Sequence, residues 1–276
     1  MKRTRYLAVQ AAKDLPSRRP SDNKTRGGKT LIRAGSKTML GAAILSATAA
    51  ARVGAGYVYL LPADKNFPHQ KHPDFLTLGS RREIPDVSFS SIAIGPGLPS
   101  TPHLQKEILW LLKHTSCPVV VDAGALTALA SFKKPVLLPD NWILTPHEGE
   151  LGRLLSLSGK DVRKDRLGSA LKAQKKWGGT LLLKGSGTLI VAEGKVIEIT
   201  TGNAALAKAG TGDVLTGMIA GFLAQGLSPR QAACLGAFVH GAIADHWIKN
   251  KKDVLSLMAS DILGEIPFAL ARLRRS

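Results

Sequence analysis

The sequence predicts an α/β fold of three layers, in which helices cover both faces of a mainly parallel central sheet. The first observation behind this prediction is that short apolar runs alternate with amphipathic segments from about Thr30 onward. Parallel strands are buried on both faces, so they read as nearly continuous apolar runs. The second observation is that glycine-rich or polar turns directly follow several of these runs. Ligands gather at the carboxyl ends of such strands, so we expect a composite cleft there.

The expected strands are short apolar runs that end at glycine, proline or polar residues. In chain order they are TLIRAG (30–35), YVYLLP (57–62), SIAIGPGL (91–98), PVVVDAG (118–124) and NWILTP (141–146), followed by two or three strands within 179–200. In that last stretch, AEGK (192–195) is typical of a hairpin turn.

The expected helices show apolar residues at helical spacing or begin at typical capping residues. They cover residues 41–56, 101–115, 161–177, 213–226, 228–250 and 259–273, with shorter helices after Asp122 and near Pro146. No internal repeat or low-complexity linker interrupts this series. We therefore expect a single domain over residues 1–276, with a basic N-terminal segment of about residues 1–28.

The net charge of +18 comes from 38 basic and 20 acidic residues. Residues 2–37 alone hold eleven Lys or Arg and two acids. Such a charge attracts phosphorylated small molecules as well as larger polyanions. Trp and Tyr are few and do not alternate with the basic runs, so we expect no nucleic-acid partner. No apolar run approaches the roughly 20 residues of a membrane span. With no apolar signal segment, we expect a cytoplasmic protein.

Cysteine and histidine usage argues against disulfides and zinc. Cys117 and Cys234 each stand beside apolar residues, which is typical of free core cysteines in a reducing compartment. His240 lies in a stretch of small residues, so we expect it in the interior. Zinc sites need closely spaced ligands. His69, His72, His103 and His114 lack that spacing.

A glycine-rich stretch, TGNAALAKAGTGDVLTG (201–217), places its only carboxylate, Asp213, directly after Gly-Thr-Gly. An acid in the first turn of a helix is also a common cap, which is the structural interpretation. The functional interpretation is a catalytic base beside an anion-binding loop, because free N–H groups at a helix N-terminus point toward a phosphate. The backbone N–H groups that would form this anion hole belong to Ala209, Gly210, Thr211 and Gly212.

Two further motifs stand at strand ends. Lys184 precedes GSGT, so it either lies beside nucleotide phosphates or simply ends a buried strand in solvent. In TPHEGE, His147 is a candidate substrate contact, and Glu150 could organise Mg²⁺ through water, although acids at a helix start are also structural. Neither GxxxxGK[ST], GxGxxG after the first strand, nor GxSxG occurs. Their absence disfavours P-loop enzymes, dinucleotide-binding dehydrogenases and serine hydrolases.

Six segments, in this order, closely resemble the ADP/ATP-dependent NAD(P)H-hydrate dehydratases of the ribokinase-like superfamily, from about Leu15 to the end of the chain. They are GAAILSATAAARVGAG, IGPGL, VVDAGAL, LTPHEGELGRLL, LLLKGSGTLI and TGNAALAKAGTGDVLTG. The resemblance implies a ribokinase-like fold and a lyase that repairs nicotinamide nucleotides. In this family the hydroxyl of (6S)-NADHX or NADPHX is phosphorylated by ADP or ATP, and elimination of phosphate restores NADH or NADPH. With ADP, the preferred donor, AMP is the other product.

The resemblance also implies roles for individual residues. Asp213 would be the catalytic base, and Mg²⁺ the metal cofactor. Substrate contacts would come from Ala42, Gly97, His147 and Asp213, and nucleotide contacts from Lys184, Gly185, Ser186, Gly187, Thr188 and Gly212. A homotetramer and a separate NAD(P)HX epimerase are further implications. Two departures from the family pattern are Glu148, where Pro is frequent, and NKTRGG (23–28), where His-Lys-Gly is common.

Two alternatives remain open on the residues. One is a ribokinase-like vitamin-precursor kinase of the hydroxymethylpyrimidine or thiazole type, which would stop at the phosphorylated product. The pairing of TPHEGE with TGNAALAKAGTGD favours the dehydratase over this kinase. The other is a basic binding protein without catalytic activity, and only the net charge supports it.

Overall fold

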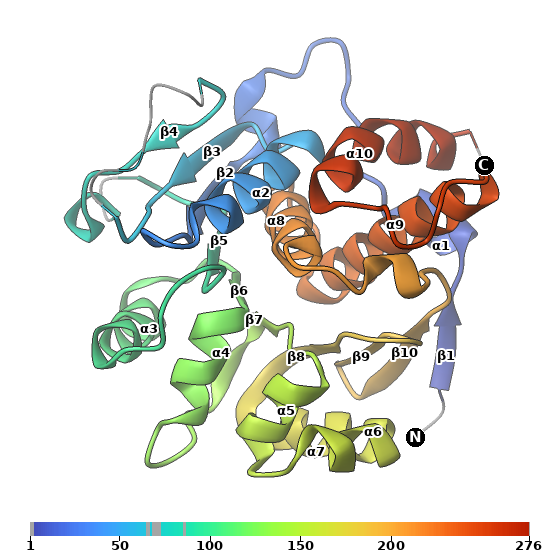
Figure 1. The fold of residues 1–276 in the computed structure, drawn as a ribbon. Coiled ribbons are helices and arrows are strands. Elements are labelled where there is room, and N and C mark those ends of the chain that lie inside the picture. Colours follow the sequence, from blue (N-terminus) through green and yellow to red (C-terminus); the bar gives the residue numbers. More distant parts are fainter. Residues whose placement is uncertain (1–2, 65–66, 68–72, 85–86, 276) are drawn as a thin grey trace.

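The protein is described from a computed structural model that covers residues 3–64, 67, 73–84 and 87–275. A single twisted sheet of ten strands forms its centre, in the order β1-β10-β9-β8-β7-β6-β5-β2-β3-β4 (Figure 1). The strands are β1 (Arg3–Tyr6), β2 (Lys29–Arg33), β3 (Tyr57–Leu60), β4 (Leu76–Thr77), β5 (Ser91–Ile94), β6 (Val119–Val121), β7 (Leu138–Leu144), β8 (Gly178–Leu183), β9 (Leu189–Ala192) and β10 (Lys195–Ile199). Only the β8–β9 and β9–β10 pairs are antiparallel, so the predicted mainly parallel sheet is confirmed.

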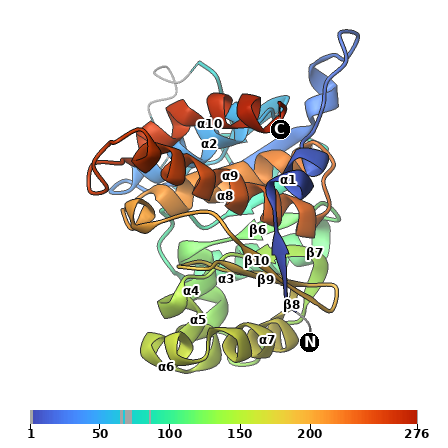
Figure 2. The ribbon, with the colours of Figure 1, turned by 90° about the vertical axis from the view of Figure 1, so that its right-hand side faces the viewer.

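Helices cover both faces of this sheet, as the alternating pattern predicts (Figures 1 and 2). One layer contains α1 (Ala8–Asp14), α2 (Leu40–Arg52), α8 (Thr211–Ala224), α9 (Pro229–Lys249) and α10 (Ala259–Leu273). The opposite layer contains α3 (Pro102–His114), α4 (Ala123–Ala130), α5 (Glu148–Leu155), α6 (Gly159–Lys164) and α7 (Arg166–Trp177). Successive strand residues point to opposite faces. Accordingly, Val120 packs in the first layer, and Val119 and Val121 in the second.

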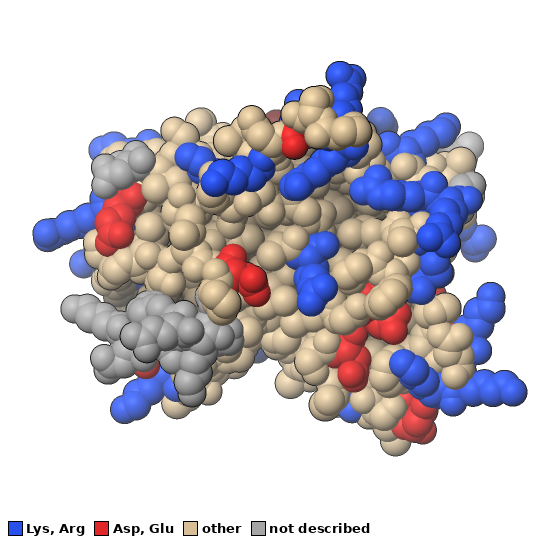
Figure 3. Space-filling model, turned by 90° about the horizontal axis from the view of Figure 1, so that it is seen from above, with Lys and Arg blue, Asp and Glu red and all other residues tan. Residues whose placement is uncertain are grey.

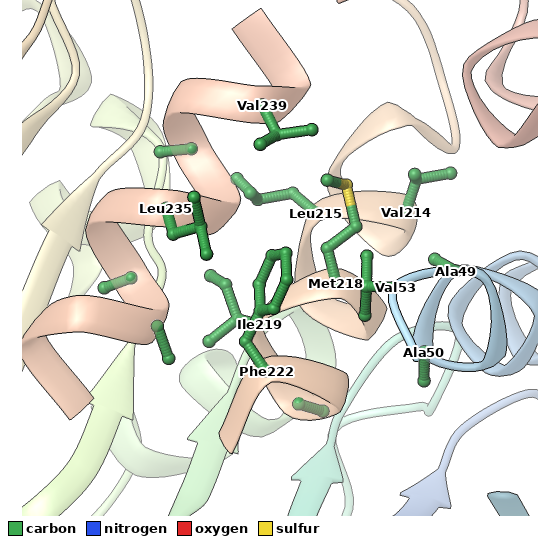
Figure 4. Packing of buried hydrophobic residues seen from close by; sticks show 14 of the residues in the cluster. Ala49, Ala50, Val53, Val214, Leu215, Met218, Ile219, Phe222, Leu235 and Val239 are labelled. Carbon is green, nitrogen blue, oxygen red and sulfur yellow. The ribbon is translucent and has the colours of Figure 1, made fainter. Parts of the chain in front are cut away.

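The small residues of α2 and α8 allow these helices to approach closely. A Cβ atom at Gly217 would lie 2.0 Å from the carbonyl oxygen of Ser46, and one at Gly221 would lie 2.4 Å from Val53 Cγ2. Figure 4 shows larger side chains filling the space around α8, with Leu215 and Ile219 toward α9 and Met218 near Val53. This packing fixes α8, and with it the helix start that carries Asp213.

Two local features differ from the sequence-based expectation. Residues 161–177 form two helices, because α6 ends at Lys164 and the Asp165 carboxylate caps α7 by accepting the Gly168 N–H at 2.8 Å. The basic N-terminal segment contains β1, which pairs in parallel with β10, and α1. No described helix combines the length and apolarity needed to cross a membrane.

Candidate active site at the carboxyl ends of β5 to β8

The candidate site lies where four parallel neighbours, β5 to β8, end at the same edge of the sheet. Asp213 reaches this edge from the first turn of α8, which begins after Gly210 in a left-handed conformation with φ of 86°. Its backbone carbonyl accepts a hydrogen bond from Ser46 Oγ at 3.0 Å, which ties it to α2. Among the described residues, the Asp213 carboxylate has no hydrogen-bond partner, so it is available to accept a proton from a ligand.

Asp122 and Lys184 form an ion pair close enough to Asp213 to interact with it electrostatically. Asp122 ends β6 and is 1 % exposed, and its Oδ1 lies 2.7 Å from Lys184 Nζ at the end of β8. Its Oδ2 accepts a hydrogen bond from Thr216 Oγ1 of α8 at 2.7 Å. Lys184 Nζ also lies 3.7 Å from Glu150 Oε2. A buried charge is stable only when it is paired. The Asp122–Lys184 ion pair and the hydrogen bond from Thr216 to Asp122 therefore hold β6, β8 and α8 together.

The charges in this group shift the pKa values of its members. Burial raises the pKa of Asp213 to about 6, with a further contribution from the nearby Asp122, although Lys184 opposes both. Burial lowers the pKa of Lys184, but Asp122 and Glu150 outweigh burial, so the pKa lies above its ordinary value and the side chain is an ammonium. A carboxylate with a pKa close to neutral is well suited to general base catalysis.

The TPHEGE segment forms the turn from β7 into α5. His147 begins α5, and its Nδ1 accepts the N–H of Gly149 at 3.0 Å, while Glu150 Oε2 accepts the His147 N–H at 2.9 Å. These two hydrogen bonds form a capping box. The structural interpretation, in which these residues cap a helix, is therefore correct. The His147 side chain is nevertheless half-exposed, and Nε2, which lies 3.6 Å from Glu150 Oε2, makes no hydrogen bond of the cap, so the ring can contact a ligand.

Ala42 and Gly97 lie together at the β5 end of the site. Gly97 follows β5 with a positive φ of 64°, and a Cβ there would lie 2.8 Å from Ala42 Cβ and 2.9 Å from the Met39 carbonyl oxygen. Both residues are buried. Only glycine fits at position 97 without displacing the start of α2.

The Lys184–Thr188 loop adjoins TPHEGE, because the Lys184 N–H donates to the Pro146 carbonyl at 2.8 Å. Gly185 and Gly187 have φ values of 135° and 62°, so the turn between β8 and β9 depends on glycine at both. A Cβ at Gly212 would lie 3.5 Å from Lys184 Nζ, which places this loop beside the glycine-rich start of α8.

The predicted anion hole spans the α8 start, where the first N–H groups of a helix have no partner within it. The Thr211 N–H, however, points to the Lys208 carbonyl at 3.5 Å, and the Thr211 hydroxyl lies 2.9 Å from the carbonyls of Leu206 and Lys208. Thr211 therefore stabilises the loop, which leaves the glycines around it to approach a ligand.

The acidic side chains around Lys184 are chemically suited to Mg²⁺, which prefers oxygen ligands. The carboxylates of Asp122, Glu150 and Asp213 share one ammonium, so negative charge is in excess. Within the described residues, no cluster of three or more His, Cys, Asp or Glu could hold a metal on its own. Mg²⁺ here would take most of its ligands from phosphate oxygens and water, as it commonly does.

His240 borders this site, where its imidazole interacts with the Thr211 backbone and with Lys184, whereas the two cysteines and the histidines of α3 lie elsewhere. His240 is buried in α9, as predicted; burial lowers its pKa to about 4, and its Nε2 has no partner among the described residues. Cys117 and Cys234 are free thiols. His103 and His114 lie on α3, whereas His69 and His72 are outside the described residues.

The residue-by-residue prediction missed Asp122, Thr216 and Arg166. Asp122 does follow a strand directly, which is the position that favours ligand sites. Arg166 carried no signal, because it lies within a run of basic residues in an amphipathic helix. Its guanidinium reaches the carbonyls of Leu183, Lys184 and Gly187.

Comparison with known proteins agrees with this architecture. Residues 30–267 match the family described as NAD(P)H-hydrate dehydratase. The bifunctional NAD(P)H-hydrate repair enzyme Nnr of Moorella thermoacetica is 39 % identical over 96 % of this chain and 53 % of its own length. The chain thus spans about half the length of several curated relatives it matches. The ADP-dependent (S)-NAD(P)H-hydrate dehydratase of Bacillus subtilis is 33 % identical, with 92 % of each chain covered.

A crystal structure of the Bacillus subtilis ADP/ATP-dependent NAD(P)H-hydrate dehydratase, co-crystallised with ATP/Mg²⁺, superimposes with a TM-score of 0.88. It is 31 % identical in sequence, and 98 % of each chain is covered. The ribokinase-like fold expected from the resemblance is therefore confirmed. Together with the family match over residues 30–267, these likenesses show that the chain belongs to the NAD(P)H-hydrate dehydratase family.

Proposed function

We propose that this protein is a lyase that dehydrates (6S)-NADHX and NADPHX to NADH and NADPH, with ADP converted to AMP and phosphate. The observation that carries this proposal is Asp213, an unpartnered carboxylate with a raised pKa of about 6 beside a glycine-rich helix start. Hydroxide is a poor leaving group and phosphate is a good one. Phosphorylation of the ring hydroxyl therefore makes the dehydration possible.

In the first step Asp213 removes the proton of the ring hydroxyl, whose oxygen then bonds to the terminal phosphorus of ADP while AMP leaves. The N–H groups of the loop over Ala209–Gly212 stabilise the charge on the transferred phosphoryl group. In the second step the C–O bond breaks, phosphate leaves with the electron pair, and the neighbouring ring carbon loses a proton. The ring double bond is thereby restored.

The remaining groups position the two ligands. Lys184 to Thr188 and Gly212 contact the nucleotide, while Ala42, Gly97 and His147 contact the hydrated dinucleotide. Glu150 would hold Mg²⁺ through water, and the ion would neutralise charge on the phosphates. Figure 3 shows many Lys and Arg side chains on the face seen from above, and such a surface favours approach of both anionic ligands. This basic surface needs no nucleic-acid or membrane partner to account for it.

We further infer that residues 1–276 act as one domain in a cytoplasmic homotetramer. An NAD(P)HX epimerase would supply the (6S) form; the relative from Moorella thermoacetica is named a bifunctional repair enzyme, and the match covers 53 % of its length. Light scattering of the purified protein tests the tetramer directly.

The decisive experiment is an absorbance assay with purified protein, hydrated NADPH, Mg²⁺ and either ADP or ATP. Growth of the reduced-nicotinamide band with one nucleotide would support the dehydratase and identify its donor. A folded protein that gives no signal with either nucleotide would contradict the proposal. A phosphorylated hydroxymethylpyrimidine or thiazole product in its place would favour the vitamin-precursor kinase.

A further inference from the structure

Arg166, the first residue of α7, reaches the underside of the Lys184–Thr188 loop. Its guanidinium Nη1 lies 3.4 Å from the Lys184 carbonyl oxygen, and Nη2 lies 3.4 Å from the carbonyls of Leu183 and Gly187. One planar group thus contacts three backbone carbonyls on both sides of the turn between β8 and β9. Its side chain is 17 % exposed, so solvent weakens these contacts little.

The glycine at position 185 makes room for this guanidinium. A Cβ atom there would lie 2.7 Å from Arg166 Nη1 and 3.3 Å from Cζ. Gly185 also has a φ of 135°. One reason for glycine at position 185 is therefore that Arg166 packs against the backbone of the loop there.

Glu148 fixes Arg166 from the TPHEGE side of the site. Its Oε1 lies 2.5 Å from Arg166 Nη1, and its Oε2 accepts from Arg163 Nε at 2.7 Å. Burial raises the pKa of Glu148, but the hydrogen bonds from Arg163 and Arg166 outweigh burial and hold the pKa below its ordinary value. The acid that departs from the family pattern is therefore ionised and points to two arginines rather than standing unpaired beside His147.

We propose that Arg166, held by Glu148, is a positioning residue that keeps the Lys184–Thr188 loop in the shape that binds the nucleotide. This inference rests on the proposed assignment of that loop to ADP. Within the loop, Arg166 contacts backbone carbonyls only, so it acts through the loop and not on the reacting atoms. It also connects the loop to α5, whose first residue is Glu148 and whose cap is His147.

The test compares Arg166→Met with the wild-type protein by direct titration of ADP and by steady-state kinetics. We expect the Kd and KM for ADP to rise about tenfold, as for the loss of hydrogen bonds from one charged donor. The KM for the hydrated dinucleotide and kcat at saturating ADP should stay within about twofold, a change too small to indicate lost catalysis. In nucleotide-free protein, the Lys184 amide should exchange its hydrogen faster, because the loop carrying it is less constrained.

Arg163→Met is the matched control, because it removes the same charge and another bond to Glu148 but touches no loop carbonyl. Its affinity for ADP should equal that of the wild type. Arg166→Lys keeps the charge without the planar fork, so it should recover only part of the affinity. If Arg166→Met binds ADP as well as the wild type does, the inference is wrong. Equal losses in Arg163→Met would also overturn it, since charge alone would then explain them. A wild type that binds no ADP would instead refute the proposed function.

Discussion

Two groups of charged residues lie at the candidate site, and the signs of their net charges are opposite. Around Lys184, one ammonium is shared by the carboxylates of Asp122, Glu150 and Asp213. Around Glu148, one carboxylate is shared by two guanidiniums. Burial, with a contribution from the neighbouring carboxylates, raises the pKa of Asp213, whereas the two arginines outweigh burial and lower the pKa of Glu148. Glu148 and Asp213 both lie in the first turn of a helix, yet Asp213 is the carboxylate that is ready to take a proton.

Burial separates Arg163 from the other members of the two groups, since the side chains of Arg166 and Glu148 are 17 % and 19 % exposed. Asp122 and Lys184 have side chains that are 2 % and 18 % exposed, whereas Arg163 is 75 % exposed. Removing one partner of a buried pair leaves an uncompensated charge, and removing one partner of an exposed pair costs little. From this comparison we expect substitutions in the group around Lys184 to change catalysis and stability. Substitutions in the group around Glu148 should change the position of the Lys184–Thr188 loop.

Asp213→Asn should have the largest effect on turnover. The amide cannot accept the hydroxyl proton, so kcat should fall by roughly two to four orders of magnitude, the usual contribution of a general base. Nucleotide binding, measured by titration, should persist because Asn keeps the size of the side chain. An Asn variant that turns over at the wild-type rate would contradict the role given to Asp213.

Asp213→Asn also tests the charge balance through stability. The folded-state pKa of Asp213 lies above its ordinary value of 3.8, so the folded protein binds this proton more tightly than the unfolded chain. Stability from this group is therefore present at low pH and decreases as pH rises from about 4 to 6. Above pH 6 the Asn variant should be more stable than wild type, by roughly 1–3 kcal/mol. Urea unfolding at pH 5 and pH 7 measures this, and a variant that is less stable at pH 7 would refute it.

Lys184→Ala should destabilise the protein and weaken ADP binding together. It leaves Asp122 buried without its cation, which costs about 3 kcal/mol or more. Asp122→Asn combined with Lys184→Ala should recover part of this loss, since the charge is then removed. ADP affinity should remain low in the double variant. Recovery of ADP affinity, or no loss in the single variant, would mean that Lys184 does not contact the nucleotide.

A smaller effect is expected in the pH profile of kcat/KM. Activity should fall below about pH 6, as Asp213 becomes protonated. In Asp122→Asn, one charge that raises the pKa of Asp213 is lost, so the acidic limb should move to lower pH by up to about one unit. Thr216→Val, which removes the hydroxyl bonded to Asp122 but no charge, is the control. A limb that does not move in Asp122→Asn would show that the charge of Asp122 does not raise the pKa of Asp213.

Much of this architecture could be predicted from the sequence, because it depends on local patterns. The apolar runs gave the parallel sheet, and the glycine-rich stretch before Asp213 located the start of α8. Asp122 was visible as a strand end but not as a partner of Lys184, since their pairing spans 62 residues. The break at Asp165 could not be foreseen either, because residues on both of its sides have helical spacing. Contacts of this kind depend on how the strands are ordered, which no local pattern specifies.

The smallest effect is expected at Arg163. Its ion pair with Glu148 is largely solvated, so Arg163→Ala should change the free energy of unfolding by at most about 0.5 kcal/mol. Glu148→Ala should cost more, because it leaves Arg166, which is 17 % exposed, without its carboxylate. Urea unfolding of both variants at low and high salt measures the difference, and only the Arg163 pair should be sensitive to salt. Equal costs at the two positions would mean that Arg166 is solvated like Arg163, and that the two sides of Glu148 do not differ.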